Sequence, residues 1–335
     1  MCINIGIFML INALALCLVN MYFFGNIPID RFFELMMESL FYPRLLWMFC
    51  IVPLIINILM TSILVRFFLK KKVVVSLASI LALLVISPFV FPKFFHTSTV
   101  PSPFYRESKG NLENSKDFLI AHAGGGIDGH IYTNSREAVE NSLERGYSFI
   151  ELDLLLSKDE KIVAVHDWER FYKNTDLSLT SDKPEPLSFE EFKAKKLHGK
   201  YTPLVYEDII ELLKKHESMI LVTDKLRDID KLEGMQIFNE RIIIESFSLK
   251  QYNKSIETGF KYPAYSISSL QSVGKILFMD IPVIVVPKRL IVHYPTVFKN
   301  LHERKVTILV YTDNDEGFIE KYQGTHFSLL YTDFL

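Results

Sequence analysis

Three long apolar runs without a charged residue occupy the N-terminal part of the chain, at Ile3–Phe24, Leu45–Val65 and Val73–Phe91. Each reaches the length of about 20 residues that a helix needs to cross a bilayer. We therefore predict an all-α transmembrane region over residues 1–95, with spans at 3–24, 45–65 and 73–91. Buried helices of a soluble core are the less favoured alternative. A cleaved signal peptide is disfavoured because no Lys or Arg precedes the first run.

Basic residues predict the orientation of these spans. Arg66, Lys70, Lys71 and Lys72 cluster between the second and third runs. The positive-inside rule places this cluster in the cytoplasm. Three spans then place everything after Phe95 outside. We expect a multi-pass cell-membrane protein whose C-terminal domain is extracytoplasmic.

The pattern changes after a polar stretch with prolines at residues 96–117, which we interpret as a linker. In residues 118–335, short apolar runs rich in β-branched residues alternate with amphipathic stretches. The runs predict strands at 118–121, 149–155, 162–165, 219–223, 242–244, 264–267, 283–286, 306–311 and 327–332. The stretches predict helices that include 135–145, 206–216, 249–258 and 268–279. Strands that alternate with helices indicate a parallel α/β sheet.

The gap between Leu155 and Ile162 is too short for a parallel crossover, so this pair of runs should form a hairpin. Setting 162–165 aside leaves the eight strands of a (β/α)8 TIM barrel, which is the predicted fold class of the C-terminal domain. An open doubly wound sheet is the alternative, but no dinucleotide-type glycine motif follows a strand. Gly124-Gly125-Gly126 has a different spacing, and we interpret it as freeing backbone next to a ligand.

Net charge and cysteine positions limit the kinds of partner and site that we expect. The net charge of −2 gives no indication of a nucleic-acid partner. All three cysteines, Cys2, Cys17 and Cys50, precede residue 96. The C-terminal domain therefore carries no disulfide and no cysteine–zinc site.

Candidate chemistry lies between His122 and His166. Glu151 and Asp153 are two positions apart in a predicted strand, so their side chains point the same way. Two carboxylates on one buried face are costly unless a cation or a proton separates them. Oxygen ligands suit Mg²⁺ or Ca²⁺ better than zinc. The two histidines then form a plausible acid/base pair around a phosphate.

The same residues occupy strand ends. His122 ends the first run, His166 ends the hairpin strand, and Asp224-Lys225 ends the next. Because TIM barrels gather their chemistry at the C-terminal ends of strands, these side chains should meet at one site.

These motifs resemble the glycerophosphodiester phosphodiesterase family, within the superfamily of barrels like phosphatidylinositol-specific phospholipase C. Ile120-Ala121-His122 looks like the opening His-Arg-Gly strand of that family, and Glu151-Leu152-Asp153 looks like its metal pair. Further similar segments are Thr133-Asn134-Ser135, Lys158-Asp159, Val163–Asp167, Thr202-Pro203-Leu204 with Glu207, Ser246-Phe247, Val310-Tyr311-Thr312 and Tyr331-Thr332-Asp333.

The resemblance implies metal-dependent hydrolysis of glycerophosphodiesters or related membrane-derived phosphoglycerol compounds, with one divalent cation, Mg²⁺ or Ca²⁺. It implies His122 and His166 as catalytic residues and Glu151 and Asp153, joined by Asp224, as metal ligands. We further assign Lys225, Asn134 and Trp168 to substrate binding, with packing under the loop as the favoured alternative for Trp168, and Asp167 to orienting His166 or its loop.

Two departures from the family pattern bear on the substrate. Ala123 stands where the family has a phosphate-binding arginine, and Lys225 is the nearest substitute. The third ligand is normally a glutamate in Glu-x-Lys, a register that gives Thr223 here, with Asp224 one place over. The loop Gly124–Tyr132 is longer than usual and should reach over the site.

Two alternative functions stay open, and these departures favour the first of them. One is a non-catalytic membrane-anchored barrel that binds a phosphoglycerol polymer or a lipid headgroup. The other is a lipid phosphodiesterase like sphingomyelinase D, which an apolar rim on the site loops would favour.

Overall fold

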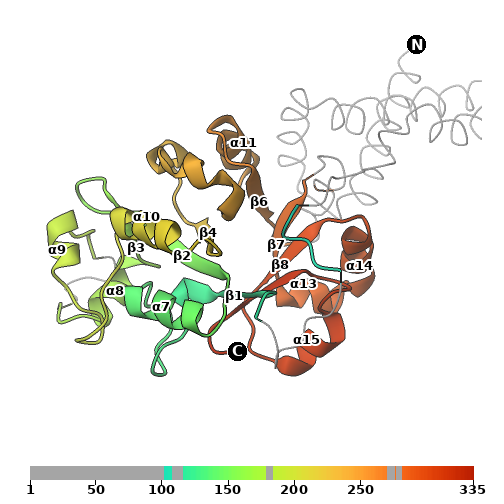
Figure 1. Ribbon diagram of the computed structural model, residues 1–335, viewed down its shortest axis with the longest axis horizontal. Coiled ribbons are helices and arrows are strands. Elements are labelled where there is room, and N and C mark those ends of the chain that lie inside the picture. The colour runs from blue at the N-terminus through green and yellow to red at the C-terminus, as the bar shows by residue number, and fades with distance from the viewer. Residues whose placement is uncertain (1–101, 108–115, 179–183, 270–275, 277–280) are drawn as a thin grey trace, which may run out of the picture. The chain divides into compact units, whose positions relative to one another are not determined.

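The computed structural model describes residues 102–107, 116–178, 184–269, 276 and 281–335 (Figure 1). The three membrane spans expected from the sequence lie outside these residues, as does most of the helix expected at 268–279. Among the described helices, none has the length and apolar character needed to cross a bilayer.

Eight parallel strands form a closed barrel. They are β1 (Leu119–Ala121), β2 (Phe149–Leu156), β4 (Ile220–Asp224), β5 (Ile242–Ser246), β6 (Tyr262–Ser266), β7 (Val283–Pro287), β8 (Thr307–Tyr311) and β9 (Leu329–Thr332). Their order around the sheet is β1-β9-β8-β7-β6-β5-β4-β2, and pairing of β1 with β2 closes the ring. β3 (Ile162–Ala164) pairs antiparallel with the end of β2. The predicted barrel and hairpin are confirmed, and the open sheet is wrong.

Helices connect the strands around the barrel (Figure 1). Those expected from the amphipathic pattern are α7 (Arg136–Glu144), α10 (Tyr206–Lys215) and α11 (Leu249–Glu257). The others are α8 (Trp168–Lys173), α9 (Phe189–Lys193), α13 (Lys288–His293), α14 (Pro295–Glu303), α15 (Glu316–Tyr322) and the 3-10 helices η4 (His122–Gly124), η5 (Ile229–Leu232) and η6 (Met235–Arg241). Ser135 begins α7 by accepting a hydrogen bond from the Ala138 N–H, the usual role of serine at a helix start.

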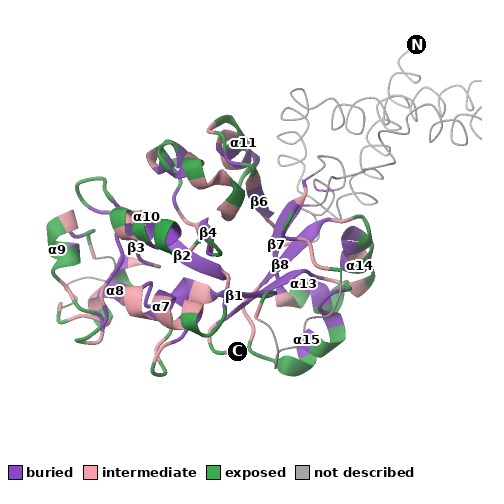
Figure 2. Cartoon of the chain, in the orientation of Figure 1, coloured by how far each residue is buried: buried purple, intermediate pink, exposed green. Residues whose placement is uncertain are grey.

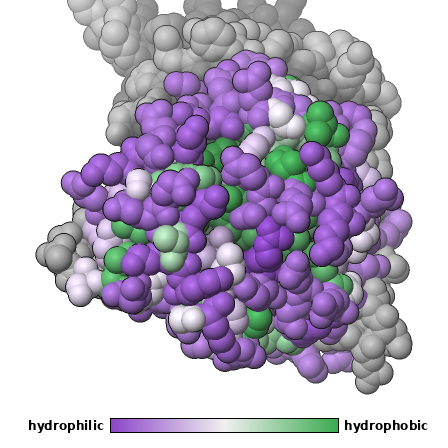
Figure 3. Space-filling model, turned by 60° about the vertical axis from the view of Figure 1, so that its left-hand side comes forward, coloured by the Kyte–Doolittle hydropathy of each residue, from purple (hydrophilic) through white to green (hydrophobic). Residues whose placement is uncertain are grey.

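Most residues of the strands are buried. Figure 2 shows buried residues along the strands and exposed residues on the outer faces of the helices. Ile150, Leu152 and Leu154 of β2 are fully buried and alternate with Glu151 and Asp153. Because neighbouring strand residues point to opposite faces, these carboxylates occupy the face turned away from the apolar side chains. Figure 3 shows a surface that is mainly hydrophilic, with separate hydrophobic spots.

The segment Ser102–Glu107, expected to be linker, packs on the barrel. Phe104 is 3% exposed and makes edge contacts with the rings of Phe149 at 5.7 Å and Tyr262 at 4.9 Å. The Ser102 hydroxyl lies 2.8 Å from that of Thr307. These three partners are the first residues of β2, β6 and β8, so the segment covers the N-terminal end of the barrel.

The glycine run after β1 serves packing. A side chain on Gly125 would collide with the Ser142 hydroxyl, and one on Gly126 with the ring of Phe334. Gly124 and Gly125 have positive φ angles of 86° and 93°, which glycine adopts readily. Close approach between parts of the chain itself therefore explains why glycines stand here, and the interpretation that they free backbone next to a ligand stays a prediction.

Candidate active site

His122 lies at the C-terminal end of β1. Its Nδ1 is 2.9 Å from Oδ1 of Asp333, which follows β9. β9 pairs with β1, so closure of the barrel brings these residues together although they are far apart in the sequence. Asp333 is a site residue that we did not single out from the sequence.

His166 follows β3 and is held in the same manner. Its Nδ1 lies 2.5 Å from Oδ2 of Asp167, while the other oxygen of Asp167 accepts the Arg170 N–H at 2.7 Å and so begins α8. Burial opposes ionisation of Asp167, but the hydrogen bonds from Arg170 and His166 outweigh it and hold the pKa of this carboxyl below its usual value.

Tyr132 lies between the two histidines. Its ring contacts His122 at 4.5 Å and His166 at 4.7 Å, both edge-on, and the Arg170 guanidinium lies 4.0 Å from the ring centre. Burial, followed by the charge of Asp333, raises the pKa of the Tyr132 hydroxyl. The long loop after β1 thus reaches over the site, as expected.

Three carboxylates form the floor of this site. Glu151, Asp153 and Asp224 each present an oxygen within 4.8 Å of the others. Asp224 reaches this cluster because β4 pairs with β2 in a register that sets Asp153 directly beside Asp224. The expectation that Asp224 joins Glu151 and Asp153 is met by this geometry.

Electrostatic repulsion in the cluster is strong. Burial and the neighbouring charge of Asp153 raise the pKa of Glu151 well above its usual value and that of Asp224 to about 9. Glu245 on β5 is also buried, and burial raises its pKa to about 7. Glu245 was missed at the sequence level, although a glutamate inside the apolar run Ile242–Ser246 is the signal that could have found it.

Neighbouring groups fix two of these carboxylates. The Ala123 N–H donates to Glu151 Oε2 at 2.7 Å. The Asn134 amide donates to Asp153 Oδ2 at 2.9 Å and accepts the Asp153 N–H at 3.0 Å. Asn134 is fully buried, so it orients Asp153 rather than lying open to substrate as expected.

The cluster has the character of a site for a hard cation. Its ligands are all oxygens, as Mg²⁺ and Ca²⁺ prefer. Asp224 Oδ1 is buried and accepts no hydrogen bond from any residue that the structure describes. A buried carboxylate oxygen without a donor is costly, and a bound cation would satisfy it.

Lys225 joins the cluster from the end of β4. Its Nζ lies 3.2 Å from Asp153 Oδ1 and donates to the His166 carbonyl at 3.1 Å. Lys225 therefore places a positive charge next to the carboxylates and to His166. This position agrees with its expected substitution for the motif arginine.

Trp168 takes the packing role that was the favoured alternative to substrate contact. It is 9% exposed and packs edge-on against Phe171 and Phe192 in a second apolar cluster beside the β2–β3 hairpin. Its ring is committed to packing, so the substrate contact expected for Trp168 is not supported by its position.

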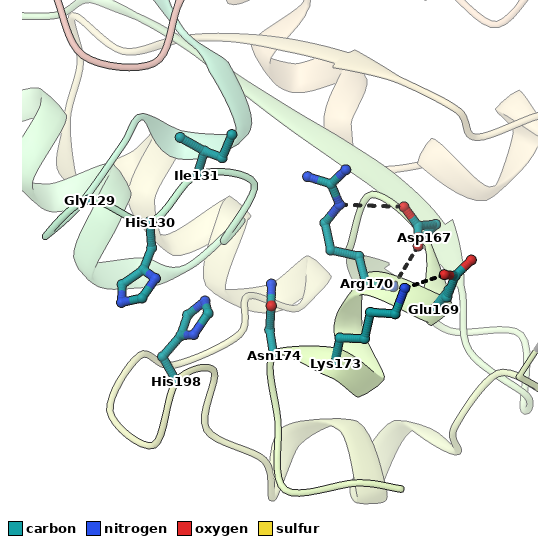
Figure 4. Close-up of a pocket in the computed structure, with 9 residues that line it drawn as sticks. All are labelled: Gly129, His130, Ile131, Asp167, Glu169, Arg170, Lys173, Asn174 and His198. Carbon is teal, nitrogen blue, oxygen red and sulfur yellow. Dashed lines mark hydrogen bonds and ion pairs between the residues drawn. The ribbon is translucent and has the colours of Figure 1, made fainter. Parts of the chain in front are cut away.

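A pocket of about 470 Å³ lies beside Asp167 (Figure 4). The rings of His130 and His198 stack there at 3.7 Å. Its cations already have partners, since Lys173 lies 2.5 Å from Glu169 and Arg170 lies 3.8 Å from Asp167. The pocket is therefore close to balanced in charge.

The chain is similar to a known protein family and to several solved structures. The model of the glycerophosphoryl diester phosphodiesterase family matches residues 122–335. The chain resembles the structure of a glycerophosphodiester phosphodiesterase from Thermotoga maritima, with 23% identity, a TM-score of 0.52 and coverage of 64% of this chain and 94% of that one. A glycerophosphodiester phosphodiesterase structure from Parabacteroides distasonis has 19% identity and a TM-score of 0.52, with 64% and 92% coverage. No curated protein matches the sequence.

Proposed function

Because the chain belongs to the glycerophosphoryl diester phosphodiesterase family, we propose that it hydrolyses glycerophosphodiesters to glycerol 3-phosphate and an alcohol at the site between His122 and His166. The observation that carries this proposal is the matched arrangement of the two histidines. Each has its Nδ1 against an aspartate, and each lies against Tyr132 beside the carboxylate cluster.

Glu151, Asp153 and Asp224 would hold one divalent cation, Mg²⁺ or Ca²⁺. When bound, this ion would neutralise the cluster and polarise a phosphate oxygen. Glu245 would add negative charge behind it, and Asn134 would keep Asp153 in position. Lys225 would contact the phosphate in place of the arginine that Ala123 replaces.

The aspartates leave the Nε2 atom of each imidazole for proton transfer. One histidine removes a proton from the nucleophile, which is water or a hydroxyl of the substrate glycerol, as it attacks phosphorus. The bond between phosphorus and the leaving oxygen breaks, and the other histidine donates a proton to that oxygen. Where the glycerol hydroxyl attacks, the product of this step is a cyclic phosphate, and water then opens the ring to glycerol 3-phosphate with the roles of the two histidines exchanged. Asp333 and Asp167 fix the orientation of the rings and stabilise each imidazolium as it forms.

The proposal is tested with the full-length chain and glycerophosphocholine, glycerophosphoethanolamine and glycerophosphoglycerol. We expect release of glycerol 3-phosphate that stops when a chelator is added and returns with Mg²⁺ or Ca²⁺. His166→Ala should abolish it, whereas His293→Ala, which changes an exposed histidine on α13, should not. A wild-type protein that releases nothing from any of the three diesters would contradict the proposal.

Cleavage of intact membrane lipid is a second candidate. It is favoured by exposed apolar side chains on the connections that follow strand ends, namely Ile131, Phe247 and Phe334. Release of headgroup from lipid vesicles, without release from soluble diesters, would support this candidate instead.

We also propose that residues 1–95 anchor the protein in the cell membrane, with the barrel outside. The proposal is supported by the three uncharged runs and by the basic cluster between the second and third. Protease added to intact cells should digest the barrel domain, and full protection would contradict this orientation.

A further inference from the structure

A second pocket, of about 670 Å³, opens beside the catalytic centre on the side of β4 and β5. Its walls come from the end of β2, from the segments after β4 and β5, and from α11. The side chains that matter for its chemistry are Leu155, Lys225, Arg227, Phe247, Lys250 and Lys254. Each of these residues lies near the C-terminal end of a strand, in the segment after it, or in the helix that follows. The pocket therefore lies on the catalytic face of the barrel.

The lining of this pocket is strongly basic. Four cations line it and no carboxylate does. The charges of two of these cations are neutralised by ion pairs, because Lys225 lies 3.2 Å from Asp153 and Lys254 lies 2.8 Å from Asp230. Arg227 and Lys250 form no ion pair with any other described residue, so two positive charges remain for a ligand.

Local backbone adds to this positive field. Ser248 begins α11, and its side chain accepts the Gln251 N–H, so the positively polarised end of that helix lies at the pocket wall. Leu155 and Phe247, which is 55% exposed, provide apolar surface for carbon atoms. The pocket therefore suits a phosphate joined to a short carbon chain.

Lys225 connects the pocket to the catalytic centre. The same side chain lines the pocket and bonds to Asp153 and to the His166 carbonyl. A ligand in the pocket would therefore lie beside Lys225, the side chain that we propose contacts the scissile phosphate. The pocket beside Asp167 differs, because its lysine and arginine are already paired with Glu169 and Asp167.

We infer that the basic pocket binds a second phosphate of the substrate, separated from the scissile diester by a short linker such as glycerol. The inference rests on the proposed function and narrows its substrate class to diesters that carry a further phosphate. Such a phosphate can belong to a soluble phosphoglycerol compound or to the headgroup of an anionic lipid.

The test compares two substrates of the full-length chain, glycerophosphoglycerol and the same diester with a phosphate on its far glycerol. The informative quantity is the ratio of kcat/KM for the phosphorylated substrate to that for the plain one. Arg227→Gln combined with Lys250→Gln removes the two unpaired charges. Lys299→Gln combined with Lys321→Gln, on α14 and α15, makes the same charge change elsewhere on the barrel.

Hydrogen bonds between ionised groups are strong enough that the wild-type ratio should be about 10 or more. The Arg227/Lys250 variant should bring the ratio close to one, and the Lys299/Lys321 variant should keep it. The preference should also weaken as salt is added, because salt screens exposed charges. A wild-type ratio near one, or a preference that survives in the Arg227/Lys250 variant, would overturn the inference.

A binding measurement distinguishes a pocket that binds no second phosphate from a chain that is not a phosphodiesterase. If the wild-type chain cleaves neither substrate, calorimetry with glycerol 1,3-bisphosphate and glycerol 3-phosphate decides. Tighter binding of the bisphosphate that is lost in the Arg227/Lys250 variant supports the pocket, and equal binding of the two overturns it.

Phosphatidylglycerol vesicles added as competitor identify the source of the phosphate. Inhibition that disappears in the Arg227/Lys250 variant supports a lipid headgroup in the pocket. A phosphate preference without inhibition by vesicles supports a soluble phosphoglycerol compound.

Discussion

Asp153 on β2 and Asp224 on β4 are paired side by side in the barrel and present carboxylate oxygens to one cluster with Glu151. Burial and the charge of Asp153 raise the pKa of Asp224 to about 9. Two carboxylates at this separation repel each other strongly in a low-dielectric site. A divalent cation is the group that best relieves this repulsion and keeps both carboxylates charged.

Asp224→Asn should therefore weaken Mg²⁺ or Ca²⁺ binding and reduce kcat/KM by about 100-fold or more, since a metal ion supplies several kcal/mol of charge stabilisation. The matched control is Thr223→Val, at the position that the family register would assign to the ligand. The Thr223 hydroxyl is buried and has no hydrogen-bond partner among the described residues, so its removal should leave folding stability unchanged or higher. Titration calorimetry and kinetics check both variants, and the reverse ranking would contradict the assignment.

Asn134→Leu should lower cation affinity by about 10- to 100-fold while all three carboxylates remain, because partners that orient a ligand typically contribute that much. Both hydrogen bonds between Asn134 and Asp153 are lost, including the one that the buried Asp153 N–H donates to Asn134 Oδ1. Unfolding free energy should also fall by about 1–3 kcal/mol. Unchanged affinity would show that Asp153 needs no support from Asn134.

Phe104→Ala should lower the free energy of unfolding by about 3–5 kcal/mol, the usual cost of removing a buried phenylalanine. Its ring fills the space between Phe149 and Tyr262 at the end of the barrel opposite the active site. Chemical denaturation measures the loss, and kcat of the folded protein should stay within about twofold. A loss below about 1 kcal/mol would mean that Ser102–Glu107 does not contribute to the fold.

His302 should make stability fall in mild acid. Burial lowers the pKa of this imidazole below 6.5, and the ring lies 2.8 Å from the Arg106 carbonyl. Above about pH 8 it is neutral whether the chain is folded or unfolded, so it has no effect there. As pH falls through about 6.5 the unfolded chain binds a proton that the folded chain resists, and stability decreases.

The check is the dependence of Tm on pH between about 8 and 5.5. His302→Gln should give a shallower decrease than the wild-type chain. Parallel curves for the two proteins would contradict the role of His302.

The barrel could be predicted from sequence because strand and helix periodicity is local and the short gap before Ile162 requires a hairpin. His122, Glu151, Asp153 and His166 could be predicted to lie near one another because they fall within one stretch with recognisable spacing, and their roles stay predictions. Asp333 was not found, because only the pairing of β9 with β1 brings it beside His122. Glu245 was missed although its place inside an apolar run was a signal, whereas the loop that carries Tyr132 was expected to reach over the site.

Side-chain roles were harder to predict than positions. Trp168 is adjacent to the site in sequence, but apolar packing against Phe171 and Phe192 draws its ring into a separate cluster. The burial of Phe104 was missed because it lies in a polar segment with prolines. Its burial depends on strands that follow much later in the sequence.

We expect His122 and His166 to divide the acid and base roles of the reaction between them. The most direct measurement compares His122→Ala and His166→Ala on glycerophosphocholine and on a glycerophosphodiester of 4-nitrophenol. The variant that lacks the acid should recover most of its activity with 4-nitrophenol, which leaves without protonation, whereas the variant that lacks the base should not. Wild-type rates in both variants, or equal losses on both substrates, would contradict this division of roles.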